Sequence, residues 1–212
     1  MTEMELREEI RRYEPFNEQE REDKKEILRQ MEQADHILTR DNRNAHITVS
    51  AWIMDRDRKK VLMAYHNLYQ SWAWLGGHAD GDADLKAVAL KEIREESGLE
   101  SVRFVTEDIF SLEILTVDGH EKRGSYVPSH LHLNVTYLLE ADPELPLRIK
   151  EDENSEIGWI GVEEIERRSK EKWFVERIYS KLCKKAQGLR DGKLAVSGMN
   201  DQGRAPGKIS VL

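Results

Sequence analysis

Residues 77–99 read GHADGDADLKAVALKEIREESGL, and this stretch decides the fold. Leu85, Val88 and Ile93 recur at the spacing of one face of an α-helix, which has about 3.6 residues per turn. Gly98 is a typical residue just beyond the last turn of a helix. The stretch therefore predicts an amphipathic helix that begins after a glycine-rich turn and ends at Gly98.

Three glutamates continue the apolar stripe of this predicted helix. Glu92, Glu95 and Glu96 stand at positions i, i+3 and i+4, so their carboxylates lie on one side and repel one another. Burying such groups is costly unless a cation lies between them. Oxygen ligands of this kind suit Mg²⁺ or Mn²⁺. We expect a divalent cation here; the alternative is a solvated acidic face on a surface helix.

Composition limits the possible classes of protein. The chain has 212 residues, enough for one domain with additions, and its net charge of −8 argues against general nucleic-acid binding. Its sole cysteine, Cys183, excludes an internal disulfide and a cysteine-based zinc cluster. No apolar run approaches the roughly 20 residues of a membrane span, and the N-terminus lacks the pattern of a signal peptide. We expect a cytoplasmic protein without a membrane partner.

Periodicity predicts helices at both ends of the chain and strands around the central helix. Two helical patterns lie within residues 3–40, separated by Pro15 and restarted at Asn17, with Glu20 at capping-box spacing. Polar residues 118–129 are expected to form a mobile loop. Further helices are expected at 162–168 and 173–187, and strands at 46–54, 61–66, 72–75, 102–105, 109–117, 131–139 and 157–160. This order predicts an α/β (α+β) fold in which helices cover both faces of a mixed sheet.

The central stretch resembles the box of the Nudix hydrolase superfamily, G-x5-E-x7-R-E-U-x-E-E-x-G-U, in which U is aliphatic. Gly77 aligns with the first glycine, and the later matches follow without a gap: Glu92, Ile93, Glu95, Glu96, Gly98 and Leu99. Ala83 replaces the first glutamate, and Lys91 replaces the arginine with a residue that lacks its planar fork. The resemblance implies a Nudix-like αβα sandwich over residues 44–187, with a helical extension at 1–43 and a tail at 188–212.

Nudix hydrolases cleave a diphosphate linked to another group, by attack of water on phosphorus with the help of divalent metal ions. The resemblance implies the ligands of Mg²⁺ or Mn²⁺: Glu92, Glu95, Glu96 and the main-chain carbonyl of Gly77. Members of the family take the general base from the box or from a later loop. The acidic run at 150–156 lies where such a loop would fall, and its candidates are Glu153 and Glu156.

Candidate substrate-binding residues surround the box: Trp72, Gly76, Gly77, His78 and Tyr126. His78 follows the first glycine directly, so it lies close to the expected phosphates. Aromatic rings can stack on a nucleobase, although aromatic side chains beside a sheet more often belong to the core. His130 and His132 share a strand face, which allows paired ligation or a phosphate contact, although a structural imidazole is the commoner outcome.

The function predicted from these residues is metal-dependent hydrolysis of a phosphoanhydride bond in a nucleoside diphosphate linked to another moiety. One alternative is a Nudix-fold binding or regulatory module without turnover, which only Ala83 and Lys91 favour. A second alternative is an isopentenyl diphosphate isomerase, whose family chemistry uses an active-site cysteine, whereas Cys183 lies far along the C-terminal helix. The N-terminal helices and the tail are additions of the kind that allow a homodimer.

Overall fold

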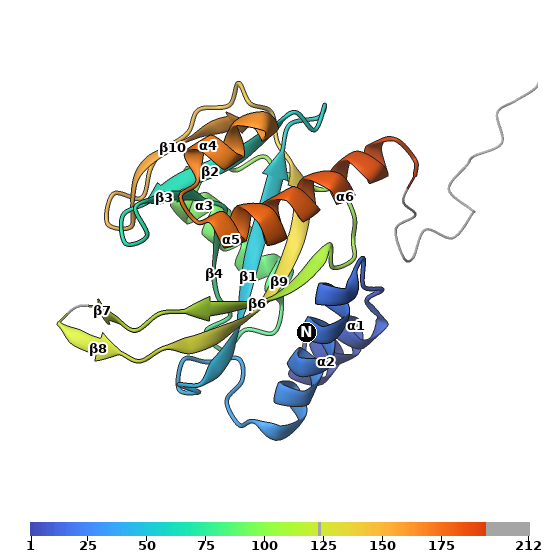
Figure 1. Ribbon diagram of the computed structural model, residues 1–212, viewed down its shortest axis with the longest axis vertical. Helices are drawn as coiled ribbons and strands as arrows, with labels where there is room; N and C mark the ends of the chain where they lie inside the picture. Colours follow the sequence, from blue (N-terminus) through green and yellow to red (C-terminus); the bar gives the residue numbers. More distant parts are fainter. Residues whose placement is uncertain (123, 194–212) are drawn as a thin grey trace, which may run out of the picture.

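A mixed sheet forms the centre of the computed structural model, which describes residues 1–122 and 124–193 (Figure 1). Its middle is the parallel pair β1 (Ala45–Met54) and β9 (His130–Glu140). The strand order is β10-β2-β1-β9-β5, and all other pairings in the sheet are antiparallel. The remaining bounds are β2 (Lys60–His66), β3 (Ser71–Ala73), β4 (Leu75–His78), β5 (Arg103–Phe104), β6 (Ser111–Val117) and β10 (Asn154–Gly161).

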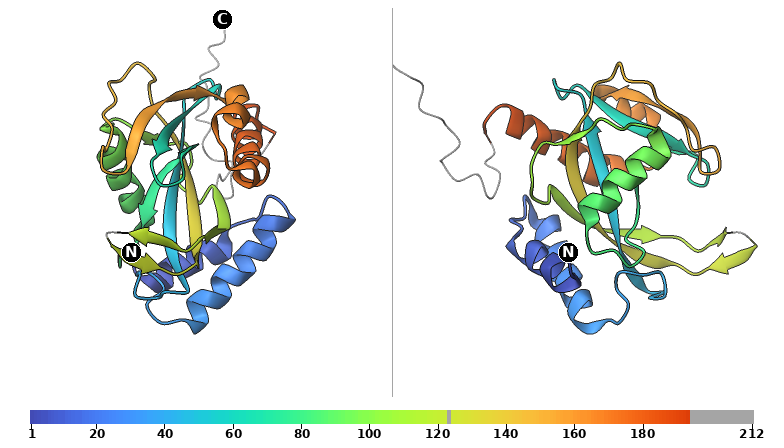
Figure 2. Two further views of the ribbon diagram at one scale, coloured as in Figure 1. Left: turned by 60° about the vertical axis from the view of Figure 1, so that its left-hand side comes forward. Right: turned by 180° about the vertical axis from the view of Figure 1, so that it is seen from behind.

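Alternation along β1 assigns its side chains to two separate cores. Ile47 and Val49 belong to the core beneath α3 (Leu85–Ser97), whereas Trp52 and Met54 belong to the core beneath η2 (Val175–Tyr179) and α6 (Ser180–Arg190). Figure 2 shows α3 and α6 on opposite faces of the sheet. The predicted sandwich with a central mixed sheet is therefore confirmed.

The N-terminal helix α2 (Glu18–Gln33) packs beside β6, and α1 (Glu3–Arg12) packs against α2. The side chain of Asn17 accepts a hydrogen bond from the Glu20 amide at 2.9 Å, which confirms the predicted restart of the helix. The helical spacing of apolar residues continues to Leu38 in the sequence, but α2 itself ends at Gln33 and the chain leaves the helix at Ala34. Ile37 is nevertheless fully buried, and its carbonyl accepts a hydrogen bond from the Ile47 amide at 2.8 Å.

Short and polar elements differ from the sequence prediction. The strand expected at 72–75 is two strands, and the second runs through Gly76 and Gly77. Residues 118–129 were expected to be irregular, but they contain a hairpin of β7 (His120–Lys122) and β8 (Ser125–Val127). Such short polar strands carry too little apolar alternation to be recognised.

The C-terminal helices follow the expected positions with small differences. Residues 162–168 form η1 (Val162–Glu164) and α4 (Ile165–Arg168), and α5 (Lys172–Phe174) leads through η2 into α6. The last helix passes residue 187 and ends at Arg190. Residues 194–212 of the expected tail lie outside the described residues. Within the described chain, no helix combines the length and apolar character needed to cross a bilayer.

Candidate active site

Two glycines allow β4 to fit between β1 and α3. A Cβ atom on Gly76 would lie 2.2 Å from the main-chain oxygen of Val49, and one on Gly77 would lie 2.5 Å from Cδ of Glu92. Both distances are far below van der Waals contact, so a larger residue at Gly76 would displace the backbone of β1 or β4, and one at Gly77 would displace the side chain of Glu92. The glycines thereby bring the strand backbone directly against the carboxylates of α3.

The helix that carries those carboxylates begins and ends as predicted. Asp84 caps its N-terminus by accepting a hydrogen bond from the Ala87 amide at 3.2 Å. Gly98 adopts the left-handed conformation at the C-cap, with φ of 71°. Leu85, Val88 and Ile93 are buried under the helix. These contacts fix the direction in which the three glutamates leave the helix.

Glu96 is the most deeply buried of these glutamates, with 6% of its surface exposed. One carboxylate oxygen accepts a hydrogen bond from the Gly76 amide at 3.0 Å, and the other accepts one from Nδ2 of Asn154 at 3.4 Å. Burial raises the pKa of Glu96 to about 8, with the nearby charge of Glu92 adding to the effect and the hydrogen bonds opposing it. In the absence of a cation this carboxyl group is therefore largely protonated at neutral pH.

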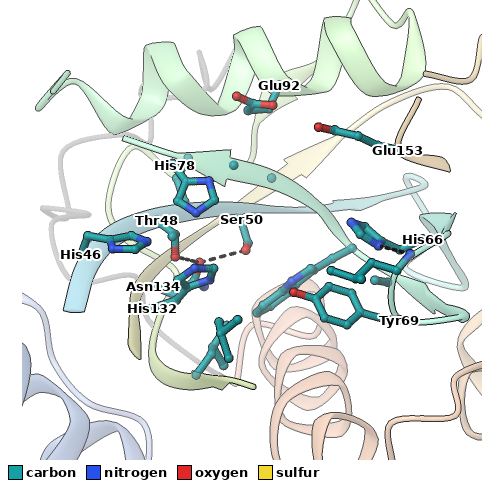
Figure 3. Close-up of a pocket in the computed structure, with 18 of the residues that line it drawn as sticks. His46, Thr48, Ser50, His66, Tyr69, His78, Glu92, His132, Asn134 and Glu153 are labelled. Atoms are coloured by element: carbon teal, nitrogen blue, oxygen red, sulfur yellow. Dashed lines mark hydrogen bonds between the residues drawn. The ribbon is translucent and has the colours of Figure 1, made fainter. Parts of the chain in front are cut away.

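The other acidic residues line one cleft of about 860 Å³ that passes over β4. Burial also raises the pKa of Glu92, and the charge of Glu95 adds to this shift. Glu153, in the loop before β10, faces Glu92 across the cleft (Figure 3). Two lysines accompany the acids: Nζ of Lys150 lies 2.8 Å from Glu153, and Nζ of Lys91 lies 3.8 Å from Glu95.

The far side of β4 presents neutral polar groups to the same cleft. The hydroxyl groups of Thr48 and Ser50 each donate to Oδ1 of Asn134 at 3.0 Å. Their positions follow from the register, because Thr48 pairs with Asn134 and His46 pairs with His132 between β1 and β9. Figure 3 shows these groups on one side of β4 and Glu92 on the other.

Two histidines in this region, His46 and His132, are held neutral by their surroundings. Burial lowers the pKa of His132 to about 2, and the neighbouring imidazoles of His78 and His46 contribute to the shift. Burial likewise lowers the pKa of His46. At neutral pH these rings therefore act as hydrogen-bonding groups or metal ligands and supply no positive charge for a phosphate.

The structure gathers most of the predicted site residues around the cleft. The predicted residues that line the cleft are Gly76, Gly77, His78, Glu92, Glu95 and Glu153. Glu96 lies buried beneath Gly76. Trp72 lies instead in the second core, with 8% of its surface exposed. Glu156 and Tyr126 are exposed and are absent from the described lining of the cleft. These three residues therefore lie apart from the gathered acids.

Several polar and aromatic residues that line the cleft were not predicted from the sequence. Polar residues alternate with apolar ones at 46–50 (HITVS) and 130–136 (HLHLNVT), and this period-2 pattern places the polar set on one strand face. That signal could have found Thr48, Ser50 and Asn134. Tyr69 and Phe174 also line the cleft, but no local pattern distinguishes them from ordinary core or loop residues.

The two departures from the box leave the acids in place. Ala83 is buried in the first core, where it contacts apolar neighbours. Asp80, an acid three residues before Ala83, forms an ion pair with Arg40 at 2.7 Å and does not take the place of the missing glutamate. Lys91 reaches Glu95, so it retains the positive charge beside the carboxylates.

A family model described as the NUDIX domain matches residues 44–182. The chain belongs to the Nudix family. Among solved structures, the C. elegans Ap4A hydrolase in a binary complex is 17% identical, with a TM-score of 0.50 over 69% of this chain and 98% of that chain. This similarity supports the Nudix fold.

Two further structures described as Nudix-family or MutT proteins are similar to this Nudix chain. A Clostridium perfringens Nudix-family hydrolase is 18% identical, with a TM-score of 0.46 over 69% of this chain and 99% of that chain. A Methanosarcina mazei MutT protein is 16% identical, with a TM-score of 0.49 over 69% of this chain and 98% of that chain. No curated protein matches the sequence.

Proposed function

We propose that this Nudix protein is a divalent-metal-dependent hydrolase that cleaves a phosphoanhydride bond in a nucleoside diphosphate linked to another moiety. The observation that carries the proposal is the buried Glu96, which is hydrogen-bonded to Gly76 and lies beside Glu92. Crowding buried carboxylates raises their pKa values and costs free energy, and a divalent cation would offset this cost.

The donor set fits Mg²⁺ or Mn²⁺, which prefer oxygen ligands. Glu92, Glu95 and Glu96 would supply carboxylates, and Gly77 would supply a main-chain carbonyl. A further polar atom, Oδ1 of Asn154, is buried without a hydrogen-bond partner beside Glu96 in the described structure. When bound, the metal supplies a Lewis acid that stabilises negative charge on phosphate oxygens and lowers the pKa of a water molecule.

Glu153 is the residue that we assign as the general base. Its side chain is half-buried, faces the acidic helix across the cleft and is held by Lys150 at 2.8 Å (Figure 3). A carboxylate in this position accepts the proton of the attacking water as the oxygen–phosphorus bond forms. Lys150 and Lys91 would attract the anionic substrate into a cleft that otherwise carries negative charge.

The rest of the cleft would hold the group attached to the diphosphate. Trp74 and Phe174 form a perpendicular aromatic pair with ring centroids 6.4 Å apart, and both line the cleft. Rings of this kind offer apolar area and stacking surfaces to a planar group. Thr48 and Ser50 also line the cleft and would provide hydroxyl groups for its polar edge.

The alternatives have less support from the described residues. The binding module without turnover was favoured only by Ala83 and Lys91, yet the acids beside these two positions remain gathered. The isomerase requires a reactive cysteine, whereas burial raises the pKa of Cys183 to about 12. That thiol packs against the second core and is absent from the described lining of the cleft.

The test is hydrolysis of a panel of nucleoside diphosphate derivatives by the full chain, with Mg²⁺ or Mn²⁺ and with EDTA. We expect metal-dependent cleavage of at least one compound, and we expect Glu153→Gln to lower kcat by about 10²-fold or more. Glu156→Gln is the matched control, because Glu156 is exposed outside the cleft, and it should retain wild-type activity. Binding without hydrolysis across the panel would contradict the proposal and favour the binding module.

A further inference from the structure

A cluster of three histidines lies on the side of β4 opposite Glu92. His46 belongs to β1, and His130 and His132 belong to β9. One ring nitrogen from each residue lies within 4.8 Å of those from the other two. The parallel register pairs His46 with His132, and alternation places His130 on the same face. The central strands of the sheet therefore hold the three imidazoles together.

Hydrogen bonds orient two of these rings in the manner of metal ligands. Nδ1 of His46 lies 3.0 Å from the Asn42 carbonyl, and Nδ1 of His130 lies 2.9 Å from the Pro128 carbonyl. Because a carbonyl only accepts hydrogen bonds, each Nδ1 must carry the proton. Each Nε2 is then unprotonated, as in histidines whose outer nitrogen is fixed by a carbonyl while the other binds a metal. The Nε2 of His130 accepts a hydrogen bond from Nε2 of His132, whereas that of His46 has no partner among the described residues.

One buried ring nitrogen of the cluster has no hydrogen-bond partner among the described residues. His46 has 4% of its surface exposed, and its Nε2 is buried without a hydrogen-bond partner in the described structure. A buried acceptor without a partner costs free energy, so such an atom calls for an explanation. A cation between the rings would provide one.

The spacing of the rings fits a tetrahedral ion. Nε2 of His130 and Nε2 of His132 are 3.2 Å apart. Two imidazole nitrogens bound tetrahedrally to Zn²⁺ at 2.0–2.1 Å are separated by about 3.3 Å. These two hydrogen-bonded nitrogens already stand at the length of one edge of the coordination polyhedron. His46, whose ring nitrogen lies within 4.8 Å of theirs, would complete a three-nitrogen face by moving closer.

We propose that His46, His130 and His132 form a second metal site, which binds a borderline transition-metal ion of the Zn²⁺ class. Nitrogen ligands distinguish it from the carboxylate site, whose hard oxygen atoms suit Mg²⁺ or Mn²⁺. Three protein ligands leave one coordination position, and the three residues line the cleft. That position would accept an oxygen or nitrogen atom of the group attached to the diphosphate.

The first experiment measures binding rather than turnover. The full chain is stripped of metal with EDTA, dialysed and titrated with Zn²⁺ by calorimetry in the presence of excess Mg²⁺. We expect one tightly bound Zn²⁺ per chain that Mg²⁺ does not displace. His130→Phe and His132→Phe should each weaken Zn²⁺ binding by about 10²-fold or more, whereas His36→Asn, an exposed residue outside the cluster, should leave it unchanged.

The second experiment uses the wild-type chain, so it tests Zn²⁺ coordination by the histidines even if the substitutions impair folding. X-ray absorption of the wild-type chain loaded with one equivalent of Zn²⁺ should show several imidazole nitrogens at about 2.0 Å. An oxygen-dominated shell, or no binding of Zn²⁺ in excess Mg²⁺, would overturn the proposal. The result is independent of the proposed hydrolase activity, because Glu153→Gln should lower turnover as stated above and retain Zn²⁺ binding.

Discussion

Glu96 shows how a single residue serves both the fold and the proposed chemistry. Its hydrogen bond from Gly76 ties α3 to β4, and its burial places a carboxyl group of raised pKa beside Glu92. A neutral carboxyl group satisfies the packed structure without a metal ion. An ionised carboxyl group requires a positive partner, so binding of the proposed metal ion would remove a proton from this residue.

Replacing this residue by its amide separates the two roles. We expect Glu96→Gln to lower metal-dependent turnover by about 10²-fold or more while the chain still folds. The folded pKa of about 8 exceeds the ordinary value of 4.5, so this group's contribution to stability is complete below pH 4.5 and is lost as the pH rises towards 8. Glutamine does not titrate. In EDTA, the variant should therefore gain stability relative to wild type between pH 5 and pH 8.

Urea unfolding in EDTA at several pH values measures this difference. If Glu96→Gln were much less stable than wild type at pH 8, the carboxyl group would owe its place to contacts that the amide cannot reproduce. The electrostatic explanation of the acidic cluster would then be wrong.

Gly77 is a second residue whose replacement tests the site. The Cβ atom of alanine at this position would overlap Cδ of Glu92, so we expect Gly77→Ala to displace that carboxylate and to weaken Mg²⁺ binding by at least tenfold. Gly158→Ala, in β10, is the control, because no heavy atom lies within 4 Å of a Cβ added there. Calorimetric titration with Mg²⁺ compares the two variants. Equal affinities would show that the close approach has no effect on the site.

Among the elements, α2 is joined to the rest of the molecule by buried charge. Glu20 is fully buried, and one of its oxygens lies 2.9 Å from Nζ of Lys185 and 3.1 Å from Nζ of Lys181 in α6. The hydroxyl groups of Tyr13 and Ser111 donate to its carboxylate at 2.6 and 2.7 Å. Burial opposes ionisation, yet Lys185 and Lys181 hold the pKa of Glu20 at about 2.

Removing that charge should be costly. Glu20→Gln leaves two buried lysines without one of their anionic partners, and breaking a buried pair in this way typically costs about 3–5 kcal/mol. Glu22→Gln is the matched control on the same helix, because Glu22 forms an exposed pair with Lys25 and should change stability by less than about 1 kcal/mol. Urea unfolding of both variants tests this. Similar losses would mean that the buried pair contributes no more than a surface pair.

The elements differ in how far the sequence could predict them. The helix at 85–97 and the strands at 45–54 and 130–140 were recognised because many apolar residues repeat with one period. The break of the strand at Trp74 follows from contacts with distant elements, which no local pattern encodes. The glutamates of the box were likewise found from spacing, whereas the gathering of His46 with His132 depends on the parallel register.

For the whole molecule, the buried charges connect the N-terminal helices with the cleft. Lys181 contacts both Glu20 and Glu113, and Glu113 accepts hydrogen bonds from Thr136 and Asn134. Asn134 in turn accepts hydrogen bonds from the hydroxyl groups that line the cleft. The network spans α2, α6 and the sheet, so a change in its ionisation affects the stability of the entire fold.

Acid should therefore unfold the molecule in part through Glu20. Because its folded pKa of about 2 lies below the ordinary value of 4.5, its contribution to stability is present above pH 4.5 and is lost as the pH falls towards 2. The difference in unfolding free energy between wild type and Glu20→Gln should narrow over that range. Urea unfolding at pH 6, 4 and 3 provides the measurement, and a constant difference would contradict the assignment.

The pairing of Glu20 with Lys185 also has a consequence for biosynthesis. The two partners are 165 positions apart in the chain, and the carboxylate is translated first. Until α6 leaves the ribosome, the surface through which α2 docks carries the Glu20 carboxylate without its lysine partner. We expect the nascent chain to stay loosely folded until α6 has been translated, and then to fold in one cooperative step.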